Sequence, residues 1–163
     1  YVMGSASDKT SVVNTKIEIR HILYVEDDCD DQTILQEVLA ELRPNIKVDC
    51  TNDGNKLLDL LTKQQPDLLL LDLVMPIKNG LECLVEIRKK REFERLPIVV
   101  YSAATNPRDI QVAYEMGANL FLIKSNSYRG LSASLAAVLD LNWNDPEAVK
   151  SQYFINGRYV AFA

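Results

Sequence analysis

Acidic side chains and one lysine follow three strongly apolar runs of the sequence. Glu26 and Asp27 end the first of these runs, Asp72 follows the second, and Lys124 follows the third. In an open parallel sheet the carboxyl ends of buried strands share one edge, so carboxylates 45 residues apart can meet there. A divalent cation would relieve their mutual repulsion, and Mg²⁺ suits a site of few carboxylates because it keeps positions for water or phosphate. The pattern predicts a magnesium site beside a lysine.

The chemistry that fits this edge is phosphoryl transfer. Asp72 lies just past a buried strand, where a carboxylate can be both metal ligand and nucleophile. Lys124 carries a mobile point charge on a long stem, and Ser102 adds a hydroxyl at the end of another apolar run. Phosphoryl transfer depends mainly on positioning and charge neutralisation, which a metal ion, an ammonium group and a hydroxyl around one carboxylate can supply.

The apolar runs belong to an alternating order of strand-like and helix-like segments. Strands are expected at 19–25, 46–50, 68–71, 98–101 and 120–123. Helical spacing of apolar residues occurs at 34–42, 57–61 and 81–87, and two further helices are expected at 107–116 and 128–139. The segments 68–71 and 98–101 are continuously apolar, which is typical of parallel strands covered on both faces. We therefore expect an α/β protein with a doubly wound (βα)5 arrangement and a five-stranded parallel sheet.

The composition excludes several classes of protein. The chain has 163 residues, 47% of them hydrophobic and 25% charged, which is enough for one core and too few for two. No run reaches the about 18 apolar residues of a membrane span, so we expect no membrane contact. A net charge of −5 provides no electrostatic basis for binding nucleic acid. The three cysteines follow no CxxC spacing, which favours reduced thiols and a cytoplasmic location.

Three parts of the chain are distinguished by composition. Residues 1–16 lack the pattern of a secretory signal and are interpreted as a flexible segment or an expression remnant. Residues 17–140 would form the domain. Residues 141–163 are too few for a DNA-binding or enzymatic effector domain, so the domain is expected to stand alone.

The extension 141–163 is rich in aromatic residues. It holds five of the chain's 12 aromatics, namely Trp143, Tyr153, Phe154, Tyr159 and Phe162. Asp145 and Pro146 predict a helix start, and Asn156-Gly157 predicts a type I′ hairpin. Because such a segment would associate nonspecifically if it were exposed, we expect it to pack on its own domain or on a second copy in a homodimer.

Four segments resemble the signature segments of a known family. Residues 22–28, 67–76, 97–103 and 117–124, in this order, are similar to those of the receiver domain of two-component response regulators, and the resemblance spans about residues 19–140. It implies a flavodoxin-like, CheY-like stand-alone domain. Such a domain accepts a phosphoryl group from a sensor histidine kinase or a histidine phosphotransfer protein and signals to a downstream protein target by a conformational switch. It catalyses its own Mg²⁺-dependent phosphorylation and dephosphorylation, and is a signalling protein and not a metabolic enzyme.

The resemblance also assigns roles to single residues. It implies that Asp72 is the phosphoacceptor, and that Lys124 and Ser102 act with it. Mg²⁺ would be held by Glu26, Asp27, Asp72 and the backbone carbonyl of Val74, and the switch pair would be Ser102 and Phe121. The side chains that orient the hydrolytic water are implied two residues after the acceptor and two after the switch hydroxyl. These are Val74 and Ala104, which cannot form hydrogen bonds through their side chains, so slow loss of phosphate is expected.

The sequence departs from the family pattern at three positions. Ser125 replaces the proline that usually follows the lysine, often after a cis peptide, which leaves the Lys124–Ser125 peptide either cis or trans. Glu26 stands where aspartate is commoner, and Phe121 lacks the hydroxyl of the usual tyrosine. An alternative is therefore a degenerate receiver that binds partners without phosphorylation, although its signature, loss of the acceptor or the lysine, is not found.

Other interpretations of the same residues are less consistent with the sequence. A flavin-binding protein is disfavoured because the acidic loop after the first run would repel a cofactor phosphate. A haloacid-dehalogenase-type phosphatase would need an aspartate where the chain has Val74. Asp28, Asp30 and Asp31 are interpreted as solvated acids that favour a helix N-terminus, and His21 as structural or exposed.

Overall fold

The computed structural model describes residues 16–76 and 78–162, so most of the segment 1–16 lies outside the described residues. The apolar runs form a parallel sheet in the order β2-β1-β3-β4-β5. Its strands are β1 (His21–Val25), β2 (Lys47–Thr51), β3 (Leu68–Leu71), β4 (Ile98–Ser102) and β5 (Leu120–Ile123). The predicted α/β class and five-stranded parallel sheet are confirmed.

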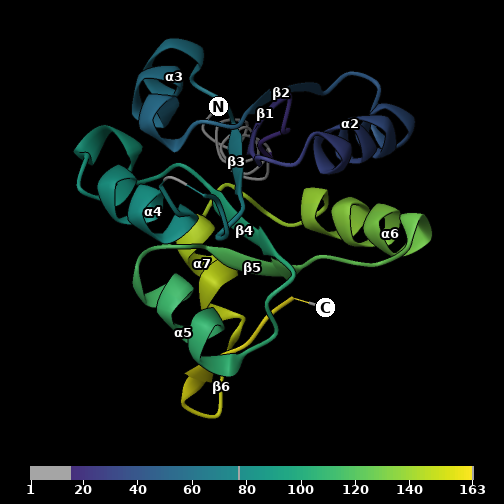
Figure 1. Cartoon of the computed structure of the whole chain (residues 1–163). Coiled ribbons are helices and arrows are strands. Elements are labelled where there is room, and N and C mark those ends of the chain that lie inside the picture. Colours follow the sequence, from purple (N-terminus) through teal and green to yellow (C-terminus); the bar gives the residue numbers. More distant parts are fainter. Residues whose placement is uncertain (1–15, 77, 163) are drawn as a thin grey trace, which may run out of the picture.

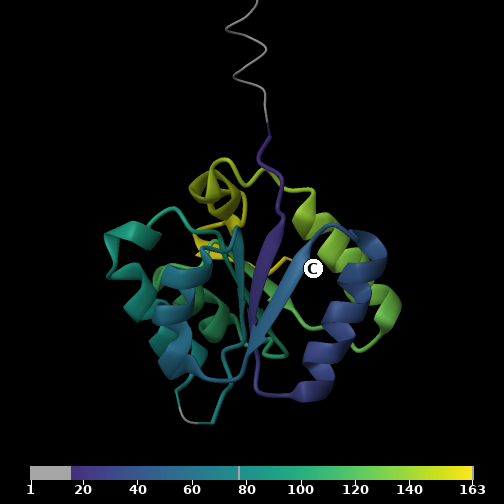
Figure 2. The ribbon, with the colours of Figure 1, turned by 90° about the horizontal axis from the view of Figure 1, so that it is seen from above.

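Helices cover both faces of the sheet. They are α2 (Cys29–Leu42), α3 (Leu57–Gln64), α4 (Gly80–Arg88), α5 (Pro107–Glu115), α6 (Tyr128–Leu139) and α7 (Pro146–Ser151), with short 3₁₀ turns η1 (Gly54–Lys56) and η2 (Arg91–Phe93). Figure 2 shows α2 and α6 together on one face, with α3, α4 and α5 on the other. This arrangement is the doubly wound topology that the alternating segments predict.

Each face of the sheet has its own hydrophobic core. Successive strand residues point to opposite faces, so Leu69 and Leu71 pack toward α3, α4 and α5, while Leu68 and Leu70 pack toward α2 and α6. All four leucines are at most 1% exposed. Burial on both faces is the physical reason why β3 is apolar at every position.

Local signals fix the helices next to the carboxyl edge of the sheet. Asp28 caps α2 by accepting hydrogen bonds from the backbone N–H groups of Asp30 and Asp31. Asn79 and Glu82 form a reciprocal capping box at the start of α4. A Cβ atom at Gly80 would lie 2.0 Å from the Asp72 carbonyl oxygen. Glycine is thus required at Gly80 to let α4 approach the end of β3.

The C-terminal extension packs on the domain itself. After α7 it forms the hairpin β6 (Phe154–Ile155) and β7 (Arg158–Tyr159), whose turn residues Asn156 and Gly157 have φ angles of 53° and 80°. These positive φ values agree with the predicted type I′ turn. Figure 1 shows α7 and the hairpin in yellow beside α5 and β5.

Contacts of the extension reach the edge strand of the sheet. The rings of Tyr114 in α5 and Tyr159 in β7 stack with centroids 4.6 Å apart. Farther on, the Phe162 N–H donates a 2.8 Å hydrogen bond to the Phe121 carbonyl, and Phe162 forms a parallel bridge with Leu122 of β5. Packing on its own domain, one of the two arrangements expected from the sequence, is therefore present. No helix in the described part of the chain could span a membrane.

Candidate functional site

Three carboxylates meet at the carboxyl edge of the sheet. Glu26 follows β1, Asp27 comes next, and Asp72 follows β3. Because β1 and β3 are neighbours and Val25 pairs with Leu71, the residues after these two strands are held side by side. One potential ligand oxygen from each of the three carboxylates lies within 4.8 Å of the others. The predicted acidic cluster is therefore present, and its oxygen ligands suit a hard divalent cation.

Glu26 is the most deeply buried of these acids, at 1% exposure. Its Oε1 accepts a 3.0 Å hydrogen bond from the Tyr24 hydroxyl, and its Oε2 accepts from the backbone N–H groups of Asp27 and Asp28 at 3.1 and 3.4 Å. A buried carboxylate needs such donors to offset the loss of water. The carboxyl group of Glu26 is therefore fixed in position at the floor of the site.

Lys124 enters the site from the end of β5. Its Nζ donates to Glu26, lies 3.0 Å from Asp31 Oδ2, and lies 3.5 Å from Asp72 Oδ2. The ammonium is also 5.4 Å from the centroid of the Tyr101 ring. Every peptide bond of the described residues is trans, including the Lys124–Ser125 bond that the sequence left undecided.

Burial and neighbouring charges have opposing effects on the pKa values of Lys124 and Glu26. Burial alone would lower the pKa of Lys124, but hydrogen bonds to Glu26 and Asp31 and the charge of Asp72 raise it above its ordinary value. Burial raises the pKa of Glu26, Lys124 opposes this effect, and Asp72 adds to it. We regard the lysine as charged, because several carboxylates share one ammonium. One ammonium group is shared among Glu26, Asp31 and Asp72 and carries a single positive charge for all of them.

Asp72 and Asp27 differ in their surroundings. Asp72 is 5% exposed, and its Oδ1 accepts a 3.3 Å hydrogen bond from the Val74 N–H. Asp27 is exposed at the rim, where partial burial and the neighbouring Glu26 raise its pKa. The Val74 side chain is 71% exposed, so the loop after β3 is open to solvent at this point.

The two proposed switch residues lie on β4 and β5. Ser102 is the last residue of β4, is 1% exposed, and accepts a 3.2 Å hydrogen bond from the Ala104 N–H through its Oγ. Phe121 lies within β5 and is fully buried. Its N–H donates to the Tyr114 hydroxyl at 3.0 Å, and its carbonyl accepts from Phe162.

Asp31 was missed as a member of this site. It was interpreted with Asp28 and Asp30 as a solvated acid at a helix start, whereas its carboxylate pairs with Lys124. The capping interpretation holds for Asp28. The signal that could have found Asp31 is helical periodicity, because Asp31 precedes the buried Leu35 and Val38 by four and seven residues on the same face of α2. His21 also has a partner, since its Nε2 lies 2.7 Å from Asp49 Oδ2.

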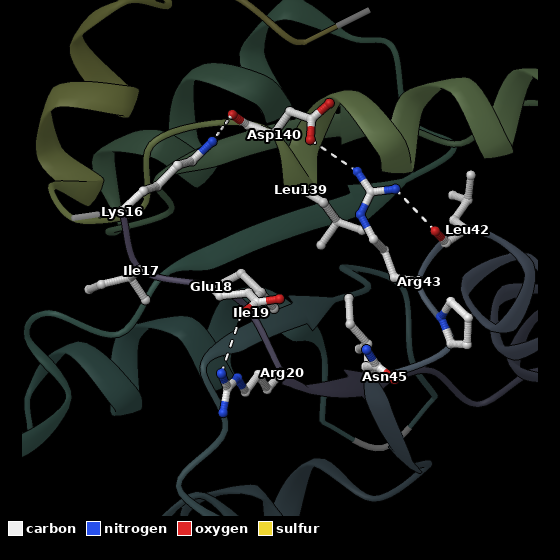
Figure 3. Close-up of a pocket in the computed structure, with 12 residues that line it drawn as sticks. Lys16, Ile17, Glu18, Ile19, Arg20, Leu42, Arg43, Asn45, Leu139 and Asp140 are labelled. Atoms are coloured by element: carbon white, nitrogen blue, oxygen red, sulfur yellow. Dashed lines mark hydrogen bonds and ion pairs between the residues drawn. The ribbon is translucent and has the colours of Figure 1, made fainter. Parts of the chain in front are cut away.

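A larger cavity lies away from this acidic cluster. It measures about 830 Å³ and is lined by residues 16–20, which precede β1, and by the C-terminal ends of α2 and α6. Figure 3 shows that its charged side chains are paired, with Arg43 donating to Asp140 and Arg20 to Glu18. It contains none of the predicted site residues. Size alone therefore does not identify the functional site of this fold.

The fold and the acidic edge define a class of protein. The family model of the response regulator receiver domain matches residues 22–136 of the chain. The chain belongs to the response regulator receiver domain family.

Individual relatives support this membership. Response regulator Rcp1 of Synechocystis sp. is 34% identical over 117 residues, which cover 68% of this chain and 80% of Rcp1. The crystal structure of Mn²⁺-bound Rcp1 matches with a TM-score of 0.65 and 31% identity, over 73% of this chain and 91% of that one. The structure of the phosphorylated cyanobacterial phytochrome response regulator RcpA matches with a TM-score of 0.67 and 31% identity, over 74% and 91%. CheY4 of Vibrio cholerae, at 23% identity and a TM-score of 0.65, shares the fold over 74% of this chain and 98% of its own.

Proposed function

We propose that this chain is a phosphoryl-accepting receiver in which Asp72 takes a phosphoryl group from a histidine kinase or a histidine phosphotransfer protein. The observation that carries this proposal is the meeting of Glu26, Asp27, Asp72 and Lys124 at one edge of the sheet. The phosphorylated structure of the related RcpA supports it.

The proposed reaction uses the Asp72 carboxylate as nucleophile. One carboxylate oxygen attacks phosphorus, the P–N bond to the donor histidine breaks, and the electron pair leaves with the imidazole nitrogen. Lys124 Nζ, already 3.5 Å from Asp72 Oδ2, would donate to a phosphoryl oxygen. The Val74 N–H beside Asp72 would keep the acceptor loop in place. These groups supply positioning and positive charge, which is what this chemistry requires.

The acidic cluster is proposed to hold Mg²⁺. Glu26, Asp27 and Asp72 offer oxygen ligands within 4.8 Å of one another, and the Val74 carbonyl is the expected fourth protein ligand. When bound, Mg²⁺ would neutralise negative charge on the transferring phosphoryl group. The Mn²⁺-bound form of Rcp1 is a precedent for a divalent cation in a relative.

Ser102 and Phe121 are the proposed switch residues. Ser102 lies at the carboxyl end of β4, and the backbone of Phe121 is held by Tyr114 on one side and by Phe162 on the other. A change in Phe121 would therefore reach the C-terminal extension as well as α5. The output is proposed to be recognition of this altered surface by a downstream protein.

The test of the acceptor is Asp72→Asn. With Mg²⁺ and acetyl phosphate, the wild type should gain the mass of one phosphoryl group, and the variant should gain none because an amide is not a nucleophile. The free energy of unfolding should be unchanged or higher without metal, since one of three repelling carboxylates is removed. Phosphoryl uptake by Asp72→Asn at the wild-type rate would show that the acceptor is another residue. No response by the wild type, under conditions that phosphorylate a control receiver, would favour phosphorylation-independent binding.

The test of the metal site is the shift in unfolding temperature caused by Mg²⁺. A ligand that binds only the folded state raises the midpoint by mass action, and Asp27→Ala should remove most of that rise. Because the pKa values of Glu26 and Asp27 are raised, protons compete with the metal at a higher pH than for ordinary carboxylates. The Mg²⁺ effect should therefore be full at neutral pH and decline as the pH falls through these raised values. The control is Asp53→Ala, because Asp53 caps η1 and does not belong to the acidic cluster. An equal Mg²⁺ shift in Asp27→Ala would place the metal elsewhere.

A further inference from the structure

Lys124 contacts one more carboxylate than the proposed reaction uses. Its ammonium has three N–H donors. One is committed to Glu26, and Asp31 Oδ2 lies 3.0 Å from Nζ, whereas Asp72 Oδ2 lies 3.5 Å away. The lysine is thus held closer to a carboxylate on α2 than to the proposed acceptor.

The position of Asp31 is fixed by the helix that carries it. Asp28 caps α2 and accepts a 3.1 Å hydrogen bond from the Asp31 N–H, while Leu35 and Val38 anchor the same face of the helix in the core. The Asp31 side chain is 42% exposed and the Lys124 side chain 17%. The ion pair is therefore partly shielded from water, which makes it stronger than a fully solvated pair.

The Asp31–Lys124 contact borders a cavity that Asp27 does not line. Asp31 and Lys124 line a small cavity of about 170 Å³ together with Tyr24 and Tyr101. Within the described residues, the group of acids whose oxygens approach one another closely enough to share a metal ion is Glu26, Asp27 and Asp72, without Asp31. Asp31 therefore contacts the lysine without belonging to the proposed metal site.

We propose that Asp31 is a positioning residue that restrains Lys124 and competes with the phosphoryl group for its ammonium. The proposal rests on the function proposed above. An incoming anionic phosphoryl group must draw the lysine from Asp31 or share it, and the Asp31 carboxylate also adds negative potential near the entering anion. Both effects disfavour the phosphorylated state. Asp31 thus lowers the affinity of the site for anionic phosphoryl donors and their mimics.

The test uses beryllofluoride, an anionic phosphoryl mimic, at saturating Mg²⁺, with ¹⁹F NMR as the readout. Asp31→Asn keeps the size of the side chain but removes its charge, and should tighten beryllofluoride binding by about two- to five-fold, the range that corresponds to a partly exposed ion pair. With acetyl phosphate, the half-saturating donor concentration should fall by a similar factor. Asp31→Glu, which restores the charge, should return both values toward wild type.

Asp30→Asn is the matched control. Asp30 occupies the same first turn of α2, is exposed, and makes no ion pair in the described part of the chain. Its substitution removes the same charge from the helix N-terminus, so it should leave beryllofluoride affinity within about 1.5-fold of wild type. Thermal unfolding of both variants checks that α2 is retained.

Each outcome decides a different question. If the wild type binds beryllofluoride and Asp31→Asn binds it equally or more weakly, Asp31 does not compete for the lysine, and the proposed function stands. If Asp30→Asn gives the same gain as Asp31→Asn, the effect is one of general charge and the specific contact is refuted. If the wild type does not bind beryllofluoride at all, both this inference and the proposed function fail.

Discussion

At the scale of single residues, the two positions implied to orient the hydrolytic water carry apolar side chains. Val74 and Ala104 line a cavity of about 360 Å³ together with Leu73, Met75 and Leu81. Val74 is 71% exposed, so this residue is open to solvent. Neither side chain can hold a water molecule by a hydrogen bond. At these two positions, therefore, no side chain could orient an attacking water by a hydrogen bond.

From this arrangement we predict a long-lived phosphorylated state. Orientation of the attacking water contributes much of the barrier reduction in hydrolysis, so Val74→Asn and Ala104→Glu should each speed dephosphorylation by about ten-fold, equivalent to about 1.4 kcal/mol of barrier. The measurement is loss of phosphate from the labelled protein after removal of the donor. Leu81→Met, a change in the same cavity that adds no hydrogen-bonding group of comparable strength, should leave the rate unchanged. Equal rates in all four proteins would mean that other groups set the lifetime.

At the scale of elements, the junction of α5, β5 and the extension depends on one hydroxyl group. Tyr114 in α5 is fully buried, and its hydroxyl accepts from the Phe121 N–H and donates to the Val160 carbonyl, both at 3.0 Å. Burial raises the pKa of this tyrosine, so the hydroxyl keeps its proton and can act as donor and acceptor together. Tyr114 therefore ties the edge strand and the extension to the same helix.

The corresponding prediction concerns Tyr114→Phe. Removing the hydroxyl leaves the buried Phe121 N–H and the Val160 carbonyl without this partner, so the free energy of unfolding should fall by about 1–3 kcal/mol. Chemical denaturation measures this loss. Tyr153→Phe is the control, because the Tyr153 hydroxyl makes no hydrogen bond in the described part of the chain, and its cost should be below about 0.5 kcal/mol. A Tyr114→Phe protein as stable as the control would show that the bridge contributes nothing.

At the scale of the whole molecule, the extension is part of the hydrophobic core. Trp143 is 2% exposed and packs in the cluster that joins α2, α6 and one face of the sheet, with its Nε1 donating a 2.9 Å hydrogen bond to the Val138 carbonyl. Val149 of α7 belongs to the same cluster, while Tyr159 packs against the cluster on the other face. The extension thus contacts both cores and closes the β5 side of the sheet.

This packing predicts a single cooperative unfolding transition. Trp143 is the only tryptophan, so its fluorescence reports on the extension, whereas far-ultraviolet circular dichroism reports on all helices. In a two-state domain both signals change at the same denaturant concentration. An earlier midpoint for the fluorescence, by more than about 0.3 M urea, would mean that the extension undocks before the domain unfolds. Tyr159→Ala, which removes a stacked ring, should shift both midpoints together.

The sequence alone determined the layers of the fold and the edge that carries the site. Four consecutive leucines in β3 can be buried only if both faces of that strand are covered, so the local pattern already requires a doubly wound sheet. Residues that follow such strands must share one edge, so the sequence positions of Glu26, Asp27, Asp72 and Lys124 already predict that they lie together. The roles of these residues in phosphoryl transfer stay predictions until the acceptor is tested.

Only the tertiary structure decided the contacts between distant segments. Periodicity can place Asp31 on the buried face of α2, but its partner Lys124 lies 93 residues away, and the pairing depends on how α2 lies against the end of β5. The extension shows the same division. Asp145-Pro146 and Asn156-Gly157 predict its helix start and its hairpin turn, but no local signal predicts that it docks on α5 and β5. Caps and turns depend on neighbouring residues, and the sequence therefore encodes them locally. Docking depends on the shape and polarity of a surface assembled from several elements, which exists only once the chain has folded.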